Sequence, residues 1–283
     1  ISSFDQGQID MALELAEKII DSAVQNGYTE EAAQALKLRA TIFQSRSNYA
    51  EAMKSALEAR ELFSNNGNVQ GESDCLNILG GVYNYLGDLN NRLKCNLSSL
   101  ELRKKLNNDN AVLSSLNNIG DTYLSLRDFE NALEYFEQCL TFNNVSDNIL
   151  AIVKCNIAEV YYLQENYEHA RSFNAEGLNH AVASDYHQII IAAYTLDGQM
   201  EMQEREYQLA LRSFEKAMEV IRENESKEQE IEVYKLMSDC YFAMGKFEKA
   251  YSYLSEHLSL FQQVSEQNNS QKMKKIEFDF QFK

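Results

Sequence analysis

One motif recurs seven times along this chain at a nearly constant distance, and it limits the fold more than any other feature. A large apolar residue marks each copy; these residues are Ile9, Tyr49, Leu89, Phe129, Tyr167, Tyr207 and Phe247. Successive copies are 40 residues apart, except for one interval of 38. Three residues further on, six of the seven copies carry alanine, and Arg92 is the exception. Such regular recurrence indicates an array of equivalent supersecondary units.

Each copy has the pattern of two helices joined by a tight turn. In residues 115–140, small and apolar residues follow helical spacing on both sides of a polar break at Arg127 and Asp128. The chain contains no proline, which favours uninterrupted helices because proline breaks helix interiors. One helix pair cannot bury its apolar face alone, so neighbouring pairs must stack. The sequence therefore predicts an all-α solenoid of antiparallel helix pairs with a period of about 40 residues.

This pattern resembles the tetratricopeptide repeat (TPR). Four residues fit the small, aromatic, small and large apolar positions of that consensus, numbered 8, 11, 20 and 24: Gly120, Tyr123, Ala132 and Phe136. The resemblance covers about residues 5–262. It implies a right-handed superhelix in which the first helix of each pair lines a concave groove.

Several features depart from the consensus. Arg92 replaces the alanine at position 20, Glu201 replaces the aromatic residue at position 11, and position 24 is asparagine at Asn96 and Asn174. The period also exceeds the usual length of about 34 residues. We expect the surplus to lengthen the helices and the loops between repeats.

The resemblance divides the chain into an array and a tail. Residues 1–262 form the array, with a half repeat at 5–26 followed by repeats that start near residues 33, 73, 113, 151, 191 and 231. Residues 263–283 are expected to be a capping or linker segment that leads to an output domain absent from this chain. The chain begins with Ile1 rather than methionine, so we expect it to be an excised piece of a longer protein.

In the resemblance, positions 2, 5, 9 and 12 of each first helix face the groove. The residues expected to bind a protein or peptide there are Lys37, Asn77, Asn84, Asn117, Asn118, Asp121, Asn156, Glu159, Tyr162, Gln199, Lys235 and Asp239. An asparagine amide both donates and accepts hydrogen bonds, so it can pair with a peptide main chain whatever the peptide's side chains are. Three carboxylates could take a basic residue of the ligand: Asp121, Glu159 and Asp239. The alternative is that these asparagines are solvated or cap local backbone.

A clamp for a terminal carboxylate, as in the TPR domains that hold chaperone C-termini, is not favoured. Lys37 and Lys235 are isolated in the sequence, and Asp121 and Asp239 oppose an anion.

Composition and motifs exclude several classes of function. The formal net charge of -17 argues against nucleic acid or an anionic membrane as the partner, because phosphate repels such a surface. The five cysteines are odd in number and form no CxxC pair, which favours reduced thiols and the cytoplasm, with the periplasm left open. The four histidines lack metal-ligand spacing, and no phosphate-binding loop occurs. We therefore expect no metal, no cofactor and no catalysis within this chain.

The last residues alternate between large apolar and polar side chains, with Ile276, Phe278, Phe280 and Phe282 as the apolar set. This period of two locally indicates a strand. The resemblance instead implies the first turns of a helix that leads into an output domain. We expect these four side chains to cap the last repeat or to pack across a homodimer.

Residues 99–136 resemble the long-period TPR arrays of bacterial signalling proteins. Those arrays precede an output domain, often a diguanylate cyclase and sometimes a histidine kinase or adenylate cyclase. The resemblance implies a sensor region in which a bound protein or peptide alters the curvature of the superhelix or the geometry of a dimer. The alternatives are a stand-alone peptide-pheromone receptor, similar to Gram-positive quorum-sensing TPR proteins, and a scaffold for a folded protein.

Overall fold

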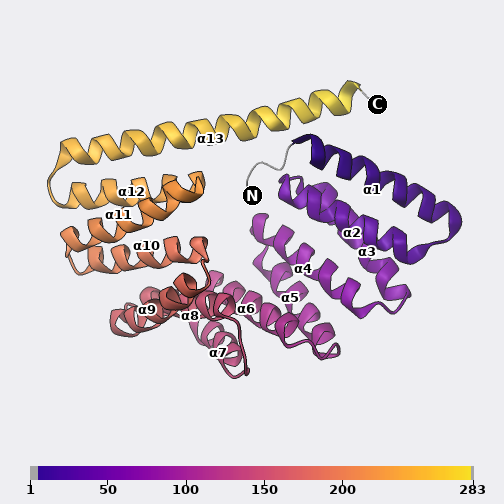
Figure 1. Ribbon diagram of the computed structural model, residues 1–283, viewed down its shortest axis with the longest axis horizontal. Coiled ribbons are helices and arrows are strands. Elements are labelled where there is room, and N and C mark those ends of the chain that lie inside the picture. Colours follow the sequence, from indigo (N-terminus) through magenta and orange to yellow (C-terminus); the bar gives the residue numbers. More distant parts are fainter. Residues whose placement is uncertain (1–5, 282–283) are drawn as a thin grey trace. The chain divides into compact units, whose positions relative to one another are not determined.

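The computed structural model describes the backbone of residues 6–281 and the side chains of residues 9–266, and all regular structure in this part is α-helical (Figure 1). The chain divides into two compact units: unit 1 is Ile1–Val145 and unit 2 is Ser146–Lys283. Unit 1 contains α1 (Gln6–Asn26), α2 (Thr29–Ser45), α3 (Tyr49–Asn65), α4 (Val69–Tyr85), α5 (Leu89–Lys104), α6 (Asp109–Ser125) and α7 (Phe129–Leu140). Unit 2 contains α8 (Asp147–Leu163), α9 (Tyr167–Ala183), α10 (His187–Gln203), α11 (Tyr207–Asn224), α12 (Lys227–Ala243) and α13 (Phe247–Gln281). The predicted all-α fold is confirmed.

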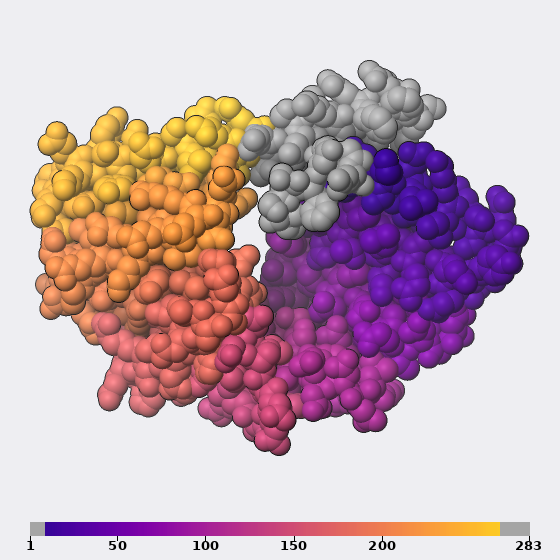
Figure 2. All heavy atoms as spheres, in the orientation of Figure 1, coloured from indigo at the N-terminus to yellow at the C-terminus, as the bar shows by residue number. Residues whose placement is uncertain are grey.

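Within each unit, consecutive helices pack against one another as a stack of pairs. The first helices of neighbouring pairs also touch, α2 with α4 in unit 1, and α8 with α10 and α10 with α12 in unit 2. Figure 2 shows side chains filling the space between neighbouring helices of a unit. The first helices α2 and α4 in unit 1, and α8, α10 and α12 in unit 2, therefore share one face of their unit.

The repeated apolar residue marks the start of the second helix. Tyr49, Leu89, Phe129, Tyr167, Tyr207 and Phe247 are the first residues of α3, α5, α7, α9, α11 and α13, whereas Ile9 lies inside α1. The first helices begin at Thr29 and its equivalents, four residues before the expected repeat starts, and have 17 residues each. The surplus over the usual period therefore lengthens the helices.

The expectation of longer loops between repeats is wrong for several of them. Residues 66–68 and 184–186 join neighbouring repeats with the same length as the turns at 46–48 and 164–166 inside a repeat. Longer helices bury more apolar side chains than longer loops would, because loops must keep their backbone polar groups in contact with water.

The turns inside the repeats share one backbone conformation. A residue with positive φ lies two residues before each second helix: Ser47, Gly87, Arg127, Glu165, Arg205 and Gly245. A left-handed residue directly after a helix ends that helix. The residue after the left-handed one often caps the second helix. Asp88 does so for α5 by accepting a hydrogen bond from the backbone N–H of Asn91 at 3.1 Å. The turn geometry thus repeats even where glycine is absent.

Small residues on the first helices make room for large rings on the second helices. A methyl group added at Gly120 would lie 2.6 Å from a ring carbon of Phe136, which is fully buried. Gly198 stands in the same relation to Phe214. The small residue at position 8 and the large one at position 24 are therefore a packing pair.

The backbone of α13 is helical from Phe247 to Gln281, so the period-two pattern near its end is not a strand there. A strand needs a partner to satisfy its backbone, whereas a helix continues from the turn before it. The side chains of Ile276, Phe278, Phe280 and Phe282 lie outside the described residues, and their role as a cap or dimer contact stays a prediction.

Candidate functional site

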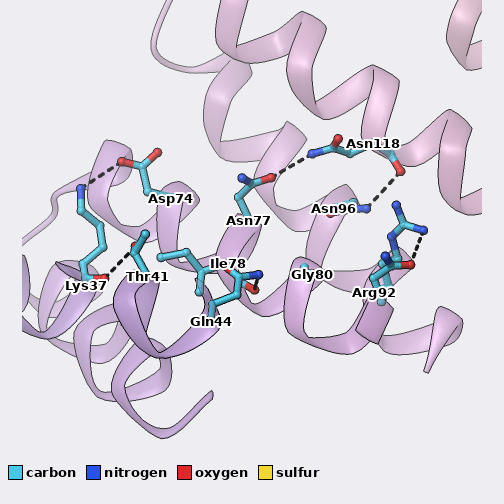
Figure 3. A pocket seen from close by; sticks show the side chains of 12 residues that line it. Lys37, Thr41, Gln44, Asp74, Asn77, Ile78, Gly80, Arg92, Asn96 and Asn118 are labelled. Carbon is cyan, nitrogen blue, oxygen red and sulfur yellow. Dashed lines mark hydrogen bonds and ion pairs between the residues drawn. The ribbon is translucent and has the colours of Figure 1, made fainter. Parts of the chain in front are cut away.

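Unit 1 contains a pocket of about 490 Å³ that we call the amide pocket. The first helices α2, α4 and α6 contribute its lining, together with Arg92 and Asn96 from α5. Four predicted groove residues lie there: Lys37, Asn77, Asn84 and Asn118. Figure 3 labels Lys37, Asn77 and Asn118 among the lining side chains. Gly80 and Gly81 leave space between these side chains because they carry none. The lining is mostly amide and polar.

Asn118 and Asn77 connect neighbouring first helices. The Nδ2 of Asn118 on α6 donates to the Oδ1 of Asn77 on α4 at 2.9 Å (Figure 3). The Nδ2 group of Asn77 has no hydrogen-bond partner within the described part of the chain. This bridge orients both amides and leaves a donor available at the pocket.

Asp74 organises the α2 side of the amide pocket. It accepts from Lys37 Nζ at 3.2 Å and from Gln70 Nε2 at 2.8 Å, and Arg103 Nη2 lies 3.7 Å away. Lys37 therefore pairs with a carboxylate of the next repeat. Two cations therefore face this single carboxylate.

Arg92 uses the place of the missing alanine to connect three helices. From α5 it donates through Nη1 to Asn84 Oδ1 on α4 at 2.9 Å, and through Nη2 to Asp121 on α6. Only 8% of Arg92 is exposed. Its charge is compensated by Asp121, so that carboxylate is already engaged and is less able to take a basic ligand residue.

Unit 2 contains a second pocket, of about 330 Å³, that we call the acidic pocket. It lies on α8, α10 and α12 with Asn174 of α9 among its lining residues. Four further predicted residues line it: Asn156, Glu159, Tyr162 and Gln199. Two carboxylates, Glu159 and Glu232, and no lysine, arginine or histidine occur among the lining residues that the structure describes.

Some predicted groove residues line neither pocket. Lys235 and Asp239 bond to each other on α12, and Asp121 pairs with Arg92. Asn117 lies on α6 and already takes part in an interaction, and it does not line the amide pocket. The structure therefore assembles eight of the twelve predicted residues into two separate pockets.

Sequence reasoning missed two kinds of pocket residue. Asp74 and Glu232 stand at position 2 of their repeats, which the resemblance already placed in the groove. Arg92, Asn96 and Asn174 stand at positions that are normally apolar and buried, so their departure from the consensus was the available signal.

The described side chains offer little for catalysis. Burial raises the pKa of the Cys75, Cys139 and Cys155 thiols to about 12, so they stay protonated and poorly nucleophilic near neutral pH. Burial also raises the pKa of Asp197. No cluster of three or more histidine, cysteine, aspartate or glutamate side chains suited to a metal ion occurs within residues 9–266. None of the described helices has the length and apolarity needed to cross a membrane.

Comparison with known proteins places the chain in a family. The sequence model of the tetratricopeptide repeat matches residues 73–144 and 189–263, which together are just over half of the chain. The chain belongs to the tetratricopeptide repeat family. The helix pairs of each unit are therefore TPR solenoid segments, and the pockets lie on the helices that line a TPR groove. No curated protein sequence matches the chain.

Several solved structures share the fold of this chain. Aspartyl phosphate phosphatase F from Bacillus subtilis superposes with a TM-score of 0.70 at 14% identity, covering 90% of this chain and 68% of that one. The apo form of RapI has a TM-score of 0.67 at 15% identity, with 92% and 99% covered. The Rap conjugation gene regulator of plasmid pLS20, in complex with the Phr* peptide, has a TM-score of 0.63 at 13% identity, with 94% and 78% covered. Similarity at this level establishes the shared fold.

Proposed function

We propose that this TPR protein is a non-catalytic regulator that binds an extended peptide on its first helices, with the amide pocket as the main-chain recognition site. The bridge between Asn118 and Asn77 carries this proposal, because it aligns two amides on neighbouring helices beside a pocket. An extended peptide presents alternating N–H and C=O groups, which such amides can pair with independently of sequence. A solved TPR structure with a bound Phr* peptide supports the same class of ligand.

Peptide selection followed by mutagenesis tests the proposal. A phage-displayed random heptapeptide library is selected on the immobilised protein, and an enriched peptide is synthesised and titrated by calorimetry. The double variant Asn77→Ala/Asn118→Ala should weaken binding about 10-fold or more, because each lost hydrogen bond costs roughly 0.5–1.5 kcal/mol. The matched control is Asn65→Ala/Asn90→Ala, which changes two exposed asparagines on second helices that line neither pocket.

The outcome is decisive in either direction. Unchanged affinity in the control and loss in the pocket variant would support main-chain recognition by the amides. An absence of enriched peptides, or equal affinity of wild type and pocket variant, would refute it.

A second candidate role is favoured by α13, which has 35 residues against 12 to 21 in the other helices. A helix that continues beyond its repeat can transmit a binding event to a following domain, so the chain would act as the sensor region of a larger signalling protein. The more specific identity of that protein as a diguanylate cyclase has no support in the fold or in the similarities above. Light scattering with and without residues 264–283 tests this role: a dimer that becomes monomeric on truncation supports it, and monomers in both cases contradict a dimerising junction.

A further inference from the structure

Both pockets contain an asparagine where two other repeats have phenylalanine. Phe136 and Phe214 at position 24 are fully buried against Gly120 and Gly198. Asn96 takes the equivalent place in the amide pocket, where its Oδ1 lies 2.7 Å from the position of a methyl group added at Gly80. Asn174 takes the equivalent place in the acidic pocket. Since asparagine is much smaller than phenylalanine, each substitution removes volume beneath the first helices where a pocket is found.

Asn174 is fully buried and only half satisfied. Its Nδ2 donates to Ala193 O at 2.9 Å and to Asp197 Oδ1 at 2.8 Å. Its Oδ1 is buried without a hydrogen-bond partner in the described part of the chain. The amide orientation is well determined, because the opposite one would turn an oxygen toward two acceptors. An unpaired buried oxygen destabilises a fold, so this residue is a poor choice for packing alone.

The described lining of the acidic pocket combines apolar side chains with negative charge. Ile191, Leu196 and Val233 form apolar, buried parts of the pocket lining. The carboxylates of Glu159 on α8 and Glu232 on α12 are exposed on its rim. The Oδ1 atom of Asn174, which has no hydrogen-bond partner in the described part of the chain, adds a partial negative charge beneath the lining. The pocket therefore combines apolar walls with acceptors and negative charge, and its volume is within the range of side-chain and small-ligand sites.

We propose that the acidic pocket is a specificity pocket for a cationic side chain, arginine above all, of a peptide bound on the first helices of unit 2, with Asn174 as the residue that opens it. This proposal rests on the peptide-binding function proposed above. A guanidinium group carries five N–H donors and no acceptor, which complements a lining of carboxylate and amide oxygens. The aliphatic part of arginine packs on apolar walls while the charged end stays near the carboxylates.

Three changes test the proposal on a peptide selected from the random heptapeptide library. Replacing its arginine by citrulline, a neutral side chain of the same shape, should weaken binding by about 10-fold or more, because a charged donor group is lost. Glu232→Gln should weaken binding of the arginine peptide several-fold and lower its salt dependence. Asn174→Leu, which restores an apolar residue, should fill the pocket and abolish the preference for arginine over citrulline.

Matched controls separate recognition from folding. Glu219→Gln neutralises an exposed glutamate on α11 that lines neither pocket and should leave affinity unchanged. Asn96→Leu makes the same substitution as Asn174→Leu in the other unit and should keep the arginine preference. Thermal unfolding shows whether each variant folds. If Asn174→Leu does not fold, Glu232→Gln still tests the proposal.

The results distinguish this proposal from the more general one. Selected peptides that show no arginine enrichment, or equal affinity for arginine and citrulline, would overturn the specificity pocket and leave the proposed binding through Asn77 and Asn118 intact. If no peptide were enriched, both proposals would fail. Arginine enrichment that both Glu232→Gln and Asn174→Leu remove would support both.

Discussion

The contact between Gly120 and Phe136 predicts a mutational effect that changes sign with its background. In the wild type, the methyl group of Gly120→Ala would lie 2.6 Å from one ring carbon of Phe136 and 2.7 Å from another. The ring is fully buried and has no open space to move into. In Phe136→Ala the ring is gone, and the same methyl group enters the space it leaves.

The magnitudes follow from the two opposing terms. Overpacking a filled core costs about 1–3 kcal/mol, while alanine is favoured over glycine in a helix interior by about 0.8–1 kcal/mol. Gly120→Ala should therefore destabilise the wild type by about 1 kcal/mol. In Phe136→Ala, which itself costs roughly 3–5 kcal/mol, the helix preference remains and Gly120→Ala should stabilise by about 1 kcal/mol. The coupling free energy between the two sites is thus about 2 kcal/mol.

Urea unfolding followed by circular dichroism measures all four proteins of this cycle, with an unchanged slope required for comparison of the midpoints. Gly87→Ala is the control, because Gly87 has φ +72° and no atom lies within 4 Å of an added methyl group. Its cost of about 1–2 kcal/mol comes from its own left-handed backbone and should be equal in both backgrounds. If Gly120→Ala had the same effect with and without the Phe136 ring, the packing pair would not explain the small residue at position 8.

Three further predictions concern burial, thiols and capping. Burial raises the pKa of Asp197, so this group favours folding below its unfolded pKa and that contribution is lost as pH rises through the folded pKa. Asp197→Asn, whose amide oxygen can still accept from Asn174, should therefore be more stable than wild type at pH 7 in urea unfolding, and this gain should shrink toward about pH 4; a gain that is independent of pH would contradict the burial argument. The thiols with pKa values raised to about 12 should react slowly with Ellman's reagent in the folded protein and rapidly after unfolding; fast reaction of these thiols in the native state would contradict their burial. Asn68 accepts from the backbone N–H of Gly71 at 2.8 Å and caps α4, so Asn68→Ala should lower the free energy of unfolding by about 1 kcal/mol, while Asn65→Ala at an exposed position should not.

The helices and their order could be predicted because the information is local. Tyr49 and its equivalents open the second helices, since apolar spacing and a polar break within a few residues define each helix start. The position of the turn was predictable for the same reason. This holds even at Arg127, where a residue other than glycine has a left-handed backbone conformation. Helix lengths were less certain, because the extra residues could have lengthened either the helices or the loops.

The pockets were only partly predictable. The groove positions of the repeat indicated asparagines on the first helices, of which Asn77, Asn84, Asn118 and Asn156 line a pocket, but they did not indicate which of them hydrogen-bond to each other. The pairing of Lys37 with Asp74 was not predicted, because the two residues are 37 positions apart in the sequence. Arg92 looked like a defect in the consensus, whereas it bonds to side chains on both neighbouring helices.

The sequence by itself thus determined a stack of TPR helix pairs, since each pair is specified by residues close together along the chain. Only the tertiary structure decided which polar side chains meet across the repeats, such as Asn118 and Asn77, which are 41 residues apart. Several partners of similar chemistry are available to each of these side chains in the sequence. Helix packing brings only some of them within hydrogen-bond distance. The result is a pocket lined by amides in unit 1 and a pocket lined by carboxylates and apolar side chains in unit 2.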